Sequence, residues 1–359
     1  MPSITREDVV NQLRTVNDPE LHQDLVTLNM VKEVQVDGGL VRVGIELTTP
    51  ACPLRGQIGA DVEEAIKRIP GVEQVEIEWG AQVRPSRPQT GEMGSVKNVI
   101  AIGSGKGGVG KSTVAVLLAT GLRRAGATVG LLDSDVYGPS IPTMIGIEGA
   151  RPEIRGNKIL PIEACGLRIM SIGLMVERDT ALIWRGPMVH GVVKQFLEQV
   201  AWGNLDYLIV DLPPGTGDVP LTLAQSIPMT GSVTVCTPQD VAVNDARRAV
   251  RMYEQLSIPC LGIIENMSYY LCPKCGHRDE LFDHGGALAA AQELGVPYLG
   301  EIPLNARLRK FGDEGTPEKA FTDADDYVVQ AIGRVVSALA GQISIRGELK
   351  RTAPTLTIE

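Results

Sequence analysis

The chain has 359 residues, of which 43% are hydrophobic and 21% charged, and its 34 basic and 43 acidic residues give a net charge of −9. This length accommodates two domains, and the acidic balance argues against a nucleic-acid partner, which needs clustered lysines and arginines. Because we find neither an apolar run of about 18–20 residues nor the apolar core of a secretory signal, we expect a cytoplasmic protein with no membrane partner.

Residues 1–83 form the first predicted domain, a small α/β unit. Thr5 followed by Asp8 is typical of a capping box and predicts a helix through about Val16. Asp37-Gly38 favours a hairpin between the two strands that follow. The remaining predicted elements are two strands, a helix and a third strand, over Met30–Val36, Gly39–Leu47, Arg55–Ile69 and Val72–Trp79.

Residues 84–96 are rich in proline, glycine and polar residues and predict a linker. In the second predicted domain, residues 97–345, strands alternate with helices, which indicates an α/β fold with a mainly parallel sheet flanked by helices. The polar residues 346–359 predict a loose tail. The strands expected in this domain are Lys97–Gly103, Thr128–Leu132, Tyr207–Val210, Ser232–Cys236, Leu261–Glu265 and Tyr298–Ile302.

The segment Gly-Lys-Gly-Gly-Val-Gly-Lys-Ser, residues 105–112, matches the phosphate-binding loop G-x-x-x-x-G-K-[ST]. It lies between a predicted strand and a predicted helix over Lys111–Ala125, which is the context that such a loop requires. We expect Lys111 to reach the β- and γ-phosphates and Ser112 to bind Mg²⁺. The predicted nucleotide contacts in this region are Gly105, Lys106, Gly107, Gly108, Val109, Gly110, Lys111, Ser112 and Thr113.

Carboxylates follow two of the predicted strands, at the edge where ligands of parallel sheets bind. Asp211 has the position of a Walker-B aspartate, which holds the Mg²⁺ shell through water. Asp133 and Asp135 end another strand, and one of them could orient the attacking water; we favour Asp135. The alternative for Asp133 and Asp211 is that they cap helices or turns.

The six cysteines do not predict a disulfide framework in a reducing cytosol. Cys272 and Cys275 form a C-x-x-C pair that leaves three alternatives open. Two chains could share one [4Fe-4S] cluster with two cysteines each; one chain could bind Zn²⁺ with His277 and His284; or the pair could be a redox dithiol. For Cys52, a second cluster or transfer ligand and a buried thiol are equally open.

Several segments together closely resemble the Mrp/ApbC-type iron–sulfur cluster carriers, within the deviant Walker A (SIMIBI, MinD/ParA) class of P-loop NTPases. The first 83 residues, with Asn-Asp-Pro-Glu-Leu and Thr-Thr-Pro-Ala-Cys-Pro, resemble the small MIP18-type domain. The segments that carry the main resemblance are residues 103–112, 132–142, 184–188, 211–218, 265–269 and 272–276.

This resemblance implies an ATP-hydrolysing homodimer that carries a labile [4Fe-4S] cluster from an assembly scaffold to apoproteins. Lys106 is implied to cross the dimer interface to the partner's phosphates, so that Lys106, Lys111 and Asp135 are the expected catalytic residues. Asn266 is implied to read the adenine ring, and Cys272 and Cys275 to bridge the cluster. The implied cofactors are ATP, Mg²⁺ and the [4Fe-4S] cluster.

Two rival functions share the loop. A partition or positioning ATPase would use the cysteines as a structural zinc knuckle, but its membrane-bound members need a basic amphipathic C-terminal helix that this tail does not resemble. A scaffold that binds ATP only structurally would leave Lys106 and Asp135 without a catalytic use.

Overall fold

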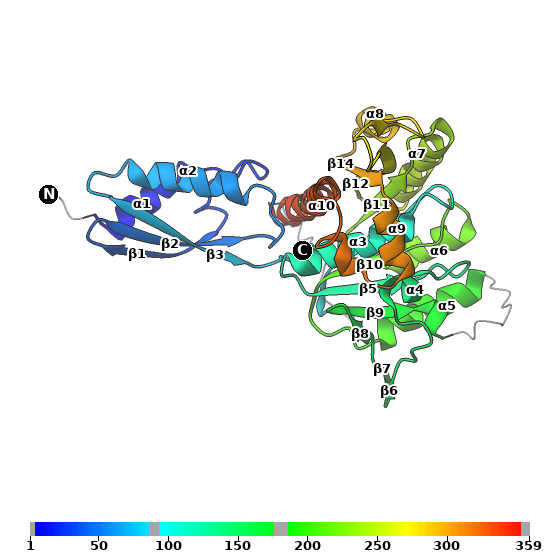
Figure 1. Ribbon diagram of the computed structural model, residues 1–359. Helices are drawn as coiled ribbons and strands as arrows, with labels where there is room; N and C mark the ends of the chain where they lie inside the picture. The colour runs from blue at the N-terminus through cyan, green and yellow to red at the C-terminus, as the bar shows by residue number, and fades with distance from the viewer. Residues whose placement is uncertain (1–3, 87–92, 176–185, 353–359) are drawn as a thin grey trace. The chain divides into compact units, whose positions relative to one another are not determined.

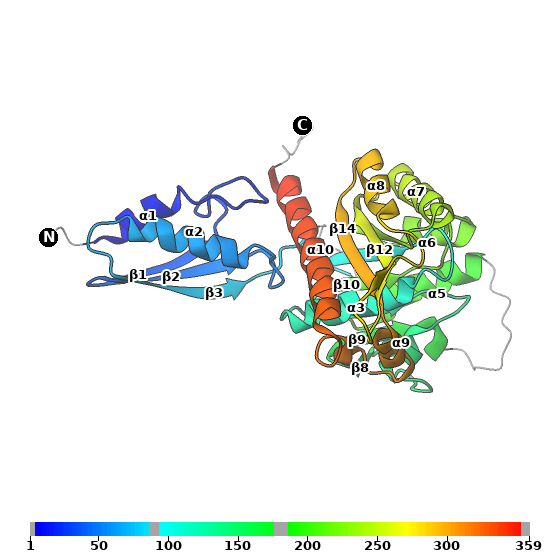
Figure 2. The ribbon, with the colours of Figure 1, turned by 45° about the horizontal axis from the view of Figure 1, so that its top comes forward.

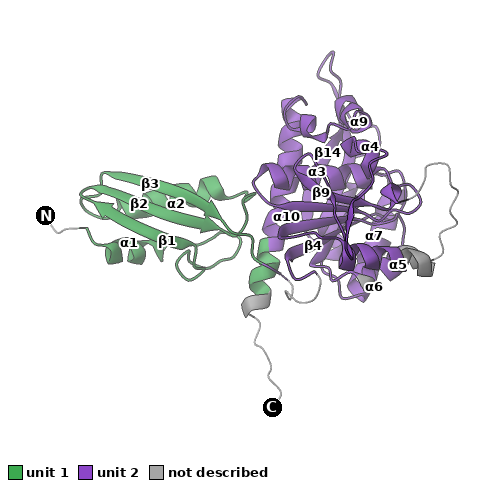
Figure 3. Ribbon diagram, turned by 90° about the horizontal axis from the view of Figure 1, so that it is seen from below, with its two compact units in different colours: residues 1–84, 344–359 green, residues 85–343 purple. Residues whose placement is uncertain are grey.

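The computed structural model describes residues 4–86, 93–175 and 186–352. Residues 87–92 of the predicted linker, the end of the tail and Trp184-Arg185, part of one segment that carries the resemblance, therefore lie outside the described residues. The chain divides into two compact units, residues 1–84 with 344–359 and residues 85–343 (Figure 3).

The first unit is a three-stranded sheet with two helices on one face (Figure 2). Thr5 Oγ1 accepts the Asp8 N–H at 3.2 Å and the Asp8 carboxylate accepts the Thr5 N–H at 3.0 Å, which confirms the capping box. Strand β2 pairs antiparallel with β1 and parallel with β3. The elements are α1 Arg6–Leu13, β1 Val31–Asp37, β2 Leu40–Leu47, α2 Arg55–Lys67 and β3 Gln74–Ala81.

The second unit contains a nine-stranded sheet, in the order β13-β12-β11-β4-β10-β5-β9-β8 with β14 beside β12. All pairings are parallel except those of β13 and β8 at the ends of this order. The strands are β4 Val96–Gly103, β5 Val129–Asp133, β8 Ile162–Ala164, β9 Leu167–Ser171, β10 Leu205–Asp211, β11 Gly231–Cys236, β12 Cys260–Leu271, β13 Arg278–Asp279 and β14 Tyr298–Leu304.

Helices lie on both faces of this sheet (Figure 1). On one face α5, α6 and α7 share a buried cluster with β4 and β10, and on the other α3 packs so closely on α10 that a Cβ on Gly121 would lie 2.5 Å from Val336. The mainly parallel α/β fold is therefore confirmed. The helices are α3 Lys111–Arg124, α4 Ile141–Ile145, α5 Gly186–Gln199, α6 Asp218–Ser226, α7 Asp240–Gln255, α8 Gly286–Leu294, α9 Ala306–Asp313 and α10 Asp326–Thr352.

The register of the central strands aligns the ends that carry the predicted site. Asp211 of β10 lies opposite Ile102 of β4 on one side and opposite Asp133 of β5 on the other. These strands are almost continuously buried, as expected for a parallel sheet covered on both faces. The phosphate loop and both acidic strand ends therefore meet at one edge.

The predicted elements and boundaries need four corrections. Strand Leu261–Glu265 continues to Leu271, and the β6–β7 hairpin (Ile154–Arg155, Lys158–Ile159) was not predicted. The predicted linker is partly packed, since Ser86 and Met93 are buried. The predicted loose tail begins inside a helix, because α10 runs to Thr352, and Glu348 near its end forms an ion pair with Arg84.

Helix α10 also changes our expectation that no segment could span a membrane. By length and composition, Asp326–Leu349 is apolar and long enough, but half of its most apolar stretch is buried inside the protein. Its buried side chains recur at helical spacing, from Val328 through Ala331, Ile332 and Val335 to Leu339. One continuous buried stripe is typical of a helix that packs on a protein core.

Candidate nucleotide and cysteine sites

The phosphate loop connects β4 to α3 through backbone that favours glycine. Gly108 and Gly110 have φ values of 81° and 80°, in the left-handed region. A Cβ on Gly110 would lie 2.2 Å from Asn266 Nδ2, so no larger residue fits without moving that side chain. The last N–H groups of the loop and the first of α3 are thereby held at the positive end of the helix, where an anion is favoured.

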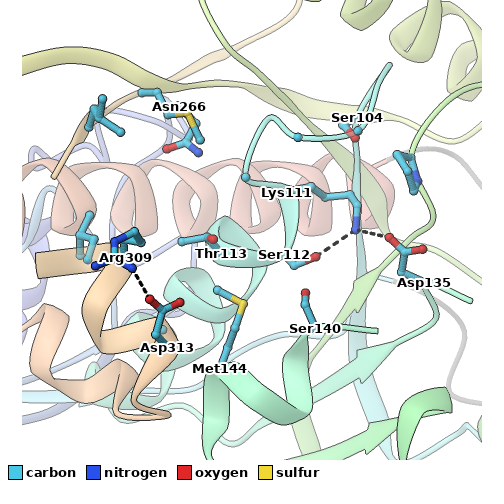
Figure 4. Close-up of a pocket in the computed structure, with 18 of the residues that line it drawn as sticks. Ser104, Lys111, Ser112, Thr113, Asp135, Ser140, Met144, Asn266, Arg309 and Asp313 are labelled. Carbon is cyan, nitrogen blue, oxygen red and sulfur yellow. Dashed lines mark hydrogen bonds and ion pairs between the residues drawn. The ribbon is translucent and has the colours of Figure 1, made fainter. Parts of the chain in front are cut away.

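Four predicted residues, Lys111, Ser112, Asp135 and Asp211, come together at the start of α3. Lys111 Nζ lies 3.5 Å from Asp135 Oδ2 (Figure 4). It also lies 2.6 Å from Asp211 Oδ1. Ser112 Oγ donates to Asp211 Oδ2 at 2.6 Å. Burial raises the pKa of Asp211, and the charge of Lys111 with the hydrogen bonds of Lys111 and Ser112 opposes that rise. The site therefore combines one buried cation with two carboxylates and a hydroxyl.

Asp133 has a different position from the one expected of a nucleotide contact. It is fully buried, outside the lining of the cavity, and its carboxylate accepts from the Asp135 N–H at 3.1 Å, the Ile141 N–H at 3.3 Å and Ser171 Oγ at 2.9 Å. Burial, followed by the nearby charge of Asp211, raises the pKa of Asp133 to about 8. These contacts show Asp133 holding the segment that carries Asp135, which is the capping alternative.

A cavity of about 640 Å³ runs from this cluster along α3. Of the predicted residues, it is lined by Lys106, Gly107, Gly108, Gly110, Lys111, Ser112, Thr113, Asp135 and Asn266. Gly105 is not in the lining because it lies against α7, where a Cβ would be 2.2 Å from the Asp245 backbone. Val109 is buried beneath the loop. This volume is in the range of small-molecule sites in proteins.

The far end of the cavity was missed by sequence reasoning. Met144 of α4 and Leu304 and Leu308 of the β14–α9 region supply apolar surface, next to an ion pair between Arg309 and Asp313 of α9. No motif marks these residues, since α4 and α9 reach the site only through the fold. An apolar wall with a few polar groups suits the base of a nucleotide.

Asn266 lies between the loop and this far end. Its Nδ2 donates to the Val109 carbonyl at 2.9 Å, and its side chain also lines the cavity. The structure therefore gives Asn266 a contact with the phosphate loop that the sequence did not predict.

Cys272 and Cys275 lie in a turn between β12 and β13. The Cys272 N–H donates to the His277 carbonyl at 2.9 Å, and the Gly276 N–H donates to the Cys272 carbonyl at 2.8 Å. The pKa of the Cys272 thiol is lowered because its sulfur accepts backbone N–H groups of Lys274 and Cys275 and interacts with the Cys275 thiol. The two sulfurs are thus adjacent, and Cys275 is exposed. A stabilised thiolate is the form of cysteine that binds metals.

The single-chain zinc alternative is not assembled in the described residues. His284 Nε2 lies 2.6 Å from Glu301 Oε2, and the described His, Cys, Asp and Glu residues that group closely are Glu265, His284 and Glu301, without either cysteine. Glu265 is itself engaged, accepting from the Gly285 and Ala287 N–H groups at the start of α8. In the described parts of the chain, Cys272 and Cys275 therefore have each other but no close third ligand.

In the first unit, Cys52 is half-buried. Burial raises the pKa of its thiol, and the carboxylates of Glu20 and Asp18 add to that rise. This environment favours the neutral thiol.

Two family models match separate stretches of the chain. One, described as NUBPL iron-transfer P-loop NTPase, covers residues 95–340. The other, described as iron-sulfur cluster assembly protein, covers residues 6–79. Their limits agree with the nine-stranded unit and the small α/β unit.

Curated proteins resemble nearly the whole chain. An iron-sulfur cluster carrier protein of Deinococcus radiodurans is 49% identical over 351 residues, which are 97% of this chain and 99% of the relative. Another, from Escherichia coli K12, is 41% identical over 359 residues, with 97% and 95% covered.

Solved structures resemble the second unit. A nucleotide-binding protein of Archaeoglobus fulgidus in complex with ADP is 39% identical, with a TM-score of 0.59, over 66% of this chain and 92% of that protein. The cell division ATPase MinD of Pyrococcus furiosus is 20% identical, with a TM-score of 0.52, over 67% and 97%. The second similarity shows the fold.

Proposed function

Because this chain belongs to the family of NUBPL iron-transfer P-loop NTPases, we propose that it is an ATP-hydrolysing carrier of iron–sulfur clusters. The observation that carries the proposal is that one unit contains both a phosphate-loop cavity and a partly exposed pair of cysteines whose sulfurs are next to each other. The rival partition function gives the cysteines only a zinc-knuckle role, for which the described residues supply no third ligand close to both sulfurs.

The cargo is a [4Fe-4S] cluster shared by two chains. Four thiolates are the usual ligand set of such a cluster, and each chain offers two neighbouring ones in Cys272 and Cys275. A two-fold axis through the cluster brings the same pair from a second copy, so the site is complete only in a homodimer. A cluster held by an interface is labile, which suits delivery to apoproteins after loading from an assembly scaffold.

In hydrolysis, Lys111 neutralises charge on the β- and γ-phosphates from its position at the start of α3. Asp135 lies 3.5 Å from Lys111 and lines the cavity, where it orients the attacking water. Lys106, also in the lining, reaches the phosphates of the partner subunit and stabilises the transition state in trans. The base of ATP lies toward Asn266 and the apolar far end.

The residues around Ser112 fit a magnesium ion. A hydroxyl held 2.6 Å from a buried carboxylate is a hard oxygen donor set of the kind that Mg²⁺ takes beside phosphates. Ser112 would hold the ion directly and Asp211 through water, and the ion would neutralise charge on the phosphates.

Anaerobic reconstitution with iron and sulfide tests the carrier function. We expect a brown dimer with about four irons from the wild type, as the four-thiolate ligand set requires, and no colour from Cys272→Ala/Cys275→Ala. The matched control Cys165→Ala/Cys260→Ala removes as many thiols elsewhere and should load normally. A colourless wild-type protein with one zinc per chain contradicts the proposal.

A further inference from the structure

Strand β12 contacts the phosphate loop and then leads directly into the cysteine pair. Asn266 in this strand donates to the Val109 carbonyl of the loop at 2.9 Å. The strand ends at Leu271, and Cys272 is the next residue. One continuous piece of backbone therefore connects Asn266, whose side chain contacts the loop, with the thiols.

Between these two points the strand is irregular. Asn266 pairs with Ile302 of β14 and Tyr270 pairs with Leu304, so that β12 has more residues than its partner over this stretch. Met267 has a φ of 56°, a left-handed conformation that non-glycine residues seldom adopt. We name residues 266–270 the β12 bulge. A bulge re-aims the strand that follows it, which here is the strand that ends at the cysteines.

Ser268 fixes the centre of this bulge. It is fully buried, and its Oγ lies 2.6 Å from Glu265 Oε1 and 2.9 Å from Glu301 Oε2. Glu265 also accepts the Gly285 and Ala287 N–H groups at 3.0 and 2.8 Å, and Glu301 contacts His284. One hydroxyl thus ties the bulge to β14 and to the start of α8. Ser268 is not part of the cavity lining.

The residues after Ser268 set the base of the cysteine turn. The guanidinium of Arg278 lies 4.0 Å from the centre of the Tyr269 ring. Tyr270 and Leu271 pair with Asp279 and Arg278 across the β12–β13 hairpin. A change in the bulge would therefore move both strands that hold Cys272 and Cys275.

We propose that Ser268 is a positioning residue that couples the phosphate loop to the cysteine pair through the β12 bulge. This inference rests on the proposed function and adds to it a route by which nucleotide controls the cargo site. A nucleotide bound beside residues 109–110 displaces Asn266. Because the contacts of Ser268 with Glu265 and Glu301 hold the β12 bulge together, the bulge moves as a unit and passes this displacement on to the cysteine turn. Tightly packed elements with two discrete arrangements carry coupling of this kind.

Thiol reactivity tests the coupling without a cluster. The full-length apo protein is alkylated with iodoacetamide, with and without saturating MgADP, and the rates at Cys272 and Cys275 are read by mass spectrometry. ADP affinity is measured separately for each protein. The test variant is Ser268→Ala. The matched control is Ser232→Ala, which removes a hydroxyl that is equally buried in the neighbouring strand β11.

We expect MgADP to change the wild-type rate about fivefold, the lower end of typical coupling between sites. Ser268→Ala should bind ADP as the wild type does but give nearly the same rate with and without it, while Ser232→Ala behaves like the wild type. A general loss of structure would also abolish ADP binding, so the separate affinity measurement distinguishes it from a loss of coupling. If Ser268→Ala does not fold, Glu301→Gln, which weakens the same tether, takes its place.

The coupling is refuted if Ser268→Ala keeps the wild-type ratio, or if the wild-type rate does not respond to MgADP. If MgADP does not change the wild-type rate but the protein still loads about four irons, as four-thiolate ligation requires, the proposed carrier function stands. The two proposals therefore fail separately.

Discussion

The nucleotide end and the cysteine end of the second unit are built in opposite ways. At the nucleotide end, Lys111 and Asp211 are buried, paired with each other and supported by side chains from neighbouring strands. At the cysteine end, the thiols lie in a turn beyond the sheet, and the hydrogen bonds described there come from the turn itself. The first site is fixed by the core of one chain, whereas the second offers two neighbouring thiols in a turn, which under the proposed function a second copy completes.

The largest expected effect is on the ATPase activity of Lys106→Ala. This variant tests whether the nucleotide site is complete in one chain. If Lys106 acts in trans, the variant should lose about 10³-fold in kcat, the lower range for a catalytic cation supplied from outside. The measurement is ATPase activity against protein concentration. Wild-type activity per chain should rise with dimer formation, and a variant with unchanged activity at all concentrations contradicts the trans role.

Asp211→Asn tests the buried character of the nucleotide end. Breaking this buried ion pair leaves Lys111 with only the longer contact to Asp135, at 3.5 Å, and should lower the free energy of unfolding by about 3 kcal/mol. Denaturant titration measures this loss. As a control, Arg42→Gln removes a half-exposed pair with Glu76, which should cost less than about 1 kcal/mol. Equal losses in the two variants would mean that Asp211 and Lys111 are not coupled as described.

Replacing the cysteine pair should have almost no effect on stability. Because the turn is exposed and outside the core, Cys272→Ser/Cys275→Ser should change the free energy of unfolding of the apo protein by less than about 0.5 kcal/mol, although cluster binding is lost. Denaturation and iron content are measured on the same samples. A loss similar to that of Asp211→Asn would show a structural role for the thiols and remove the contrast between the two ends.

The last prediction concerns the pH dependence of stability. Burial raises the pKa of Asp133 to about 8 in the folded protein, above its ordinary value of 3.8. The folded state then binds more protons than the unfolded state between these values, so this group makes stability fall as pH rises through that window. Urea denaturation at several pH values should show that the free energy of unfolding falls less steeply with pH in Asp133→Asn than in the wild type, whatever the absolute stability of the variant. Equal slopes in the two proteins would exclude a contribution of Asp133.

Sequence reasoning succeeded where the chemistry lies in contiguous residues. The family inferred from the motifs is confirmed by the matching family model and relatives. The loop at residues 105–112, the acidic strand ends and the C-x-x-C pair are local patterns, and the parallel sheet follows from alternation of apolar strands and helices. Given such a sheet, the meeting of Lys111, Asp135 and Asp211 at one edge was predictable from the strand ends alone.

Only the tertiary structure decided which distant side chains join these motifs. Met144, Leu308 and Arg309 line the far end of the cavity because α4 and α9 pack there. His284 lies against Glu301 and not beside the cysteines, because β14 runs parallel to β12. Asn266 and Ser268 gained their contacts from a bulge that no sequence pattern marks. Local patterns determine which groups are present, but contacts between strands and helices far apart in the chain depend on packing and register, which are settled by the whole fold.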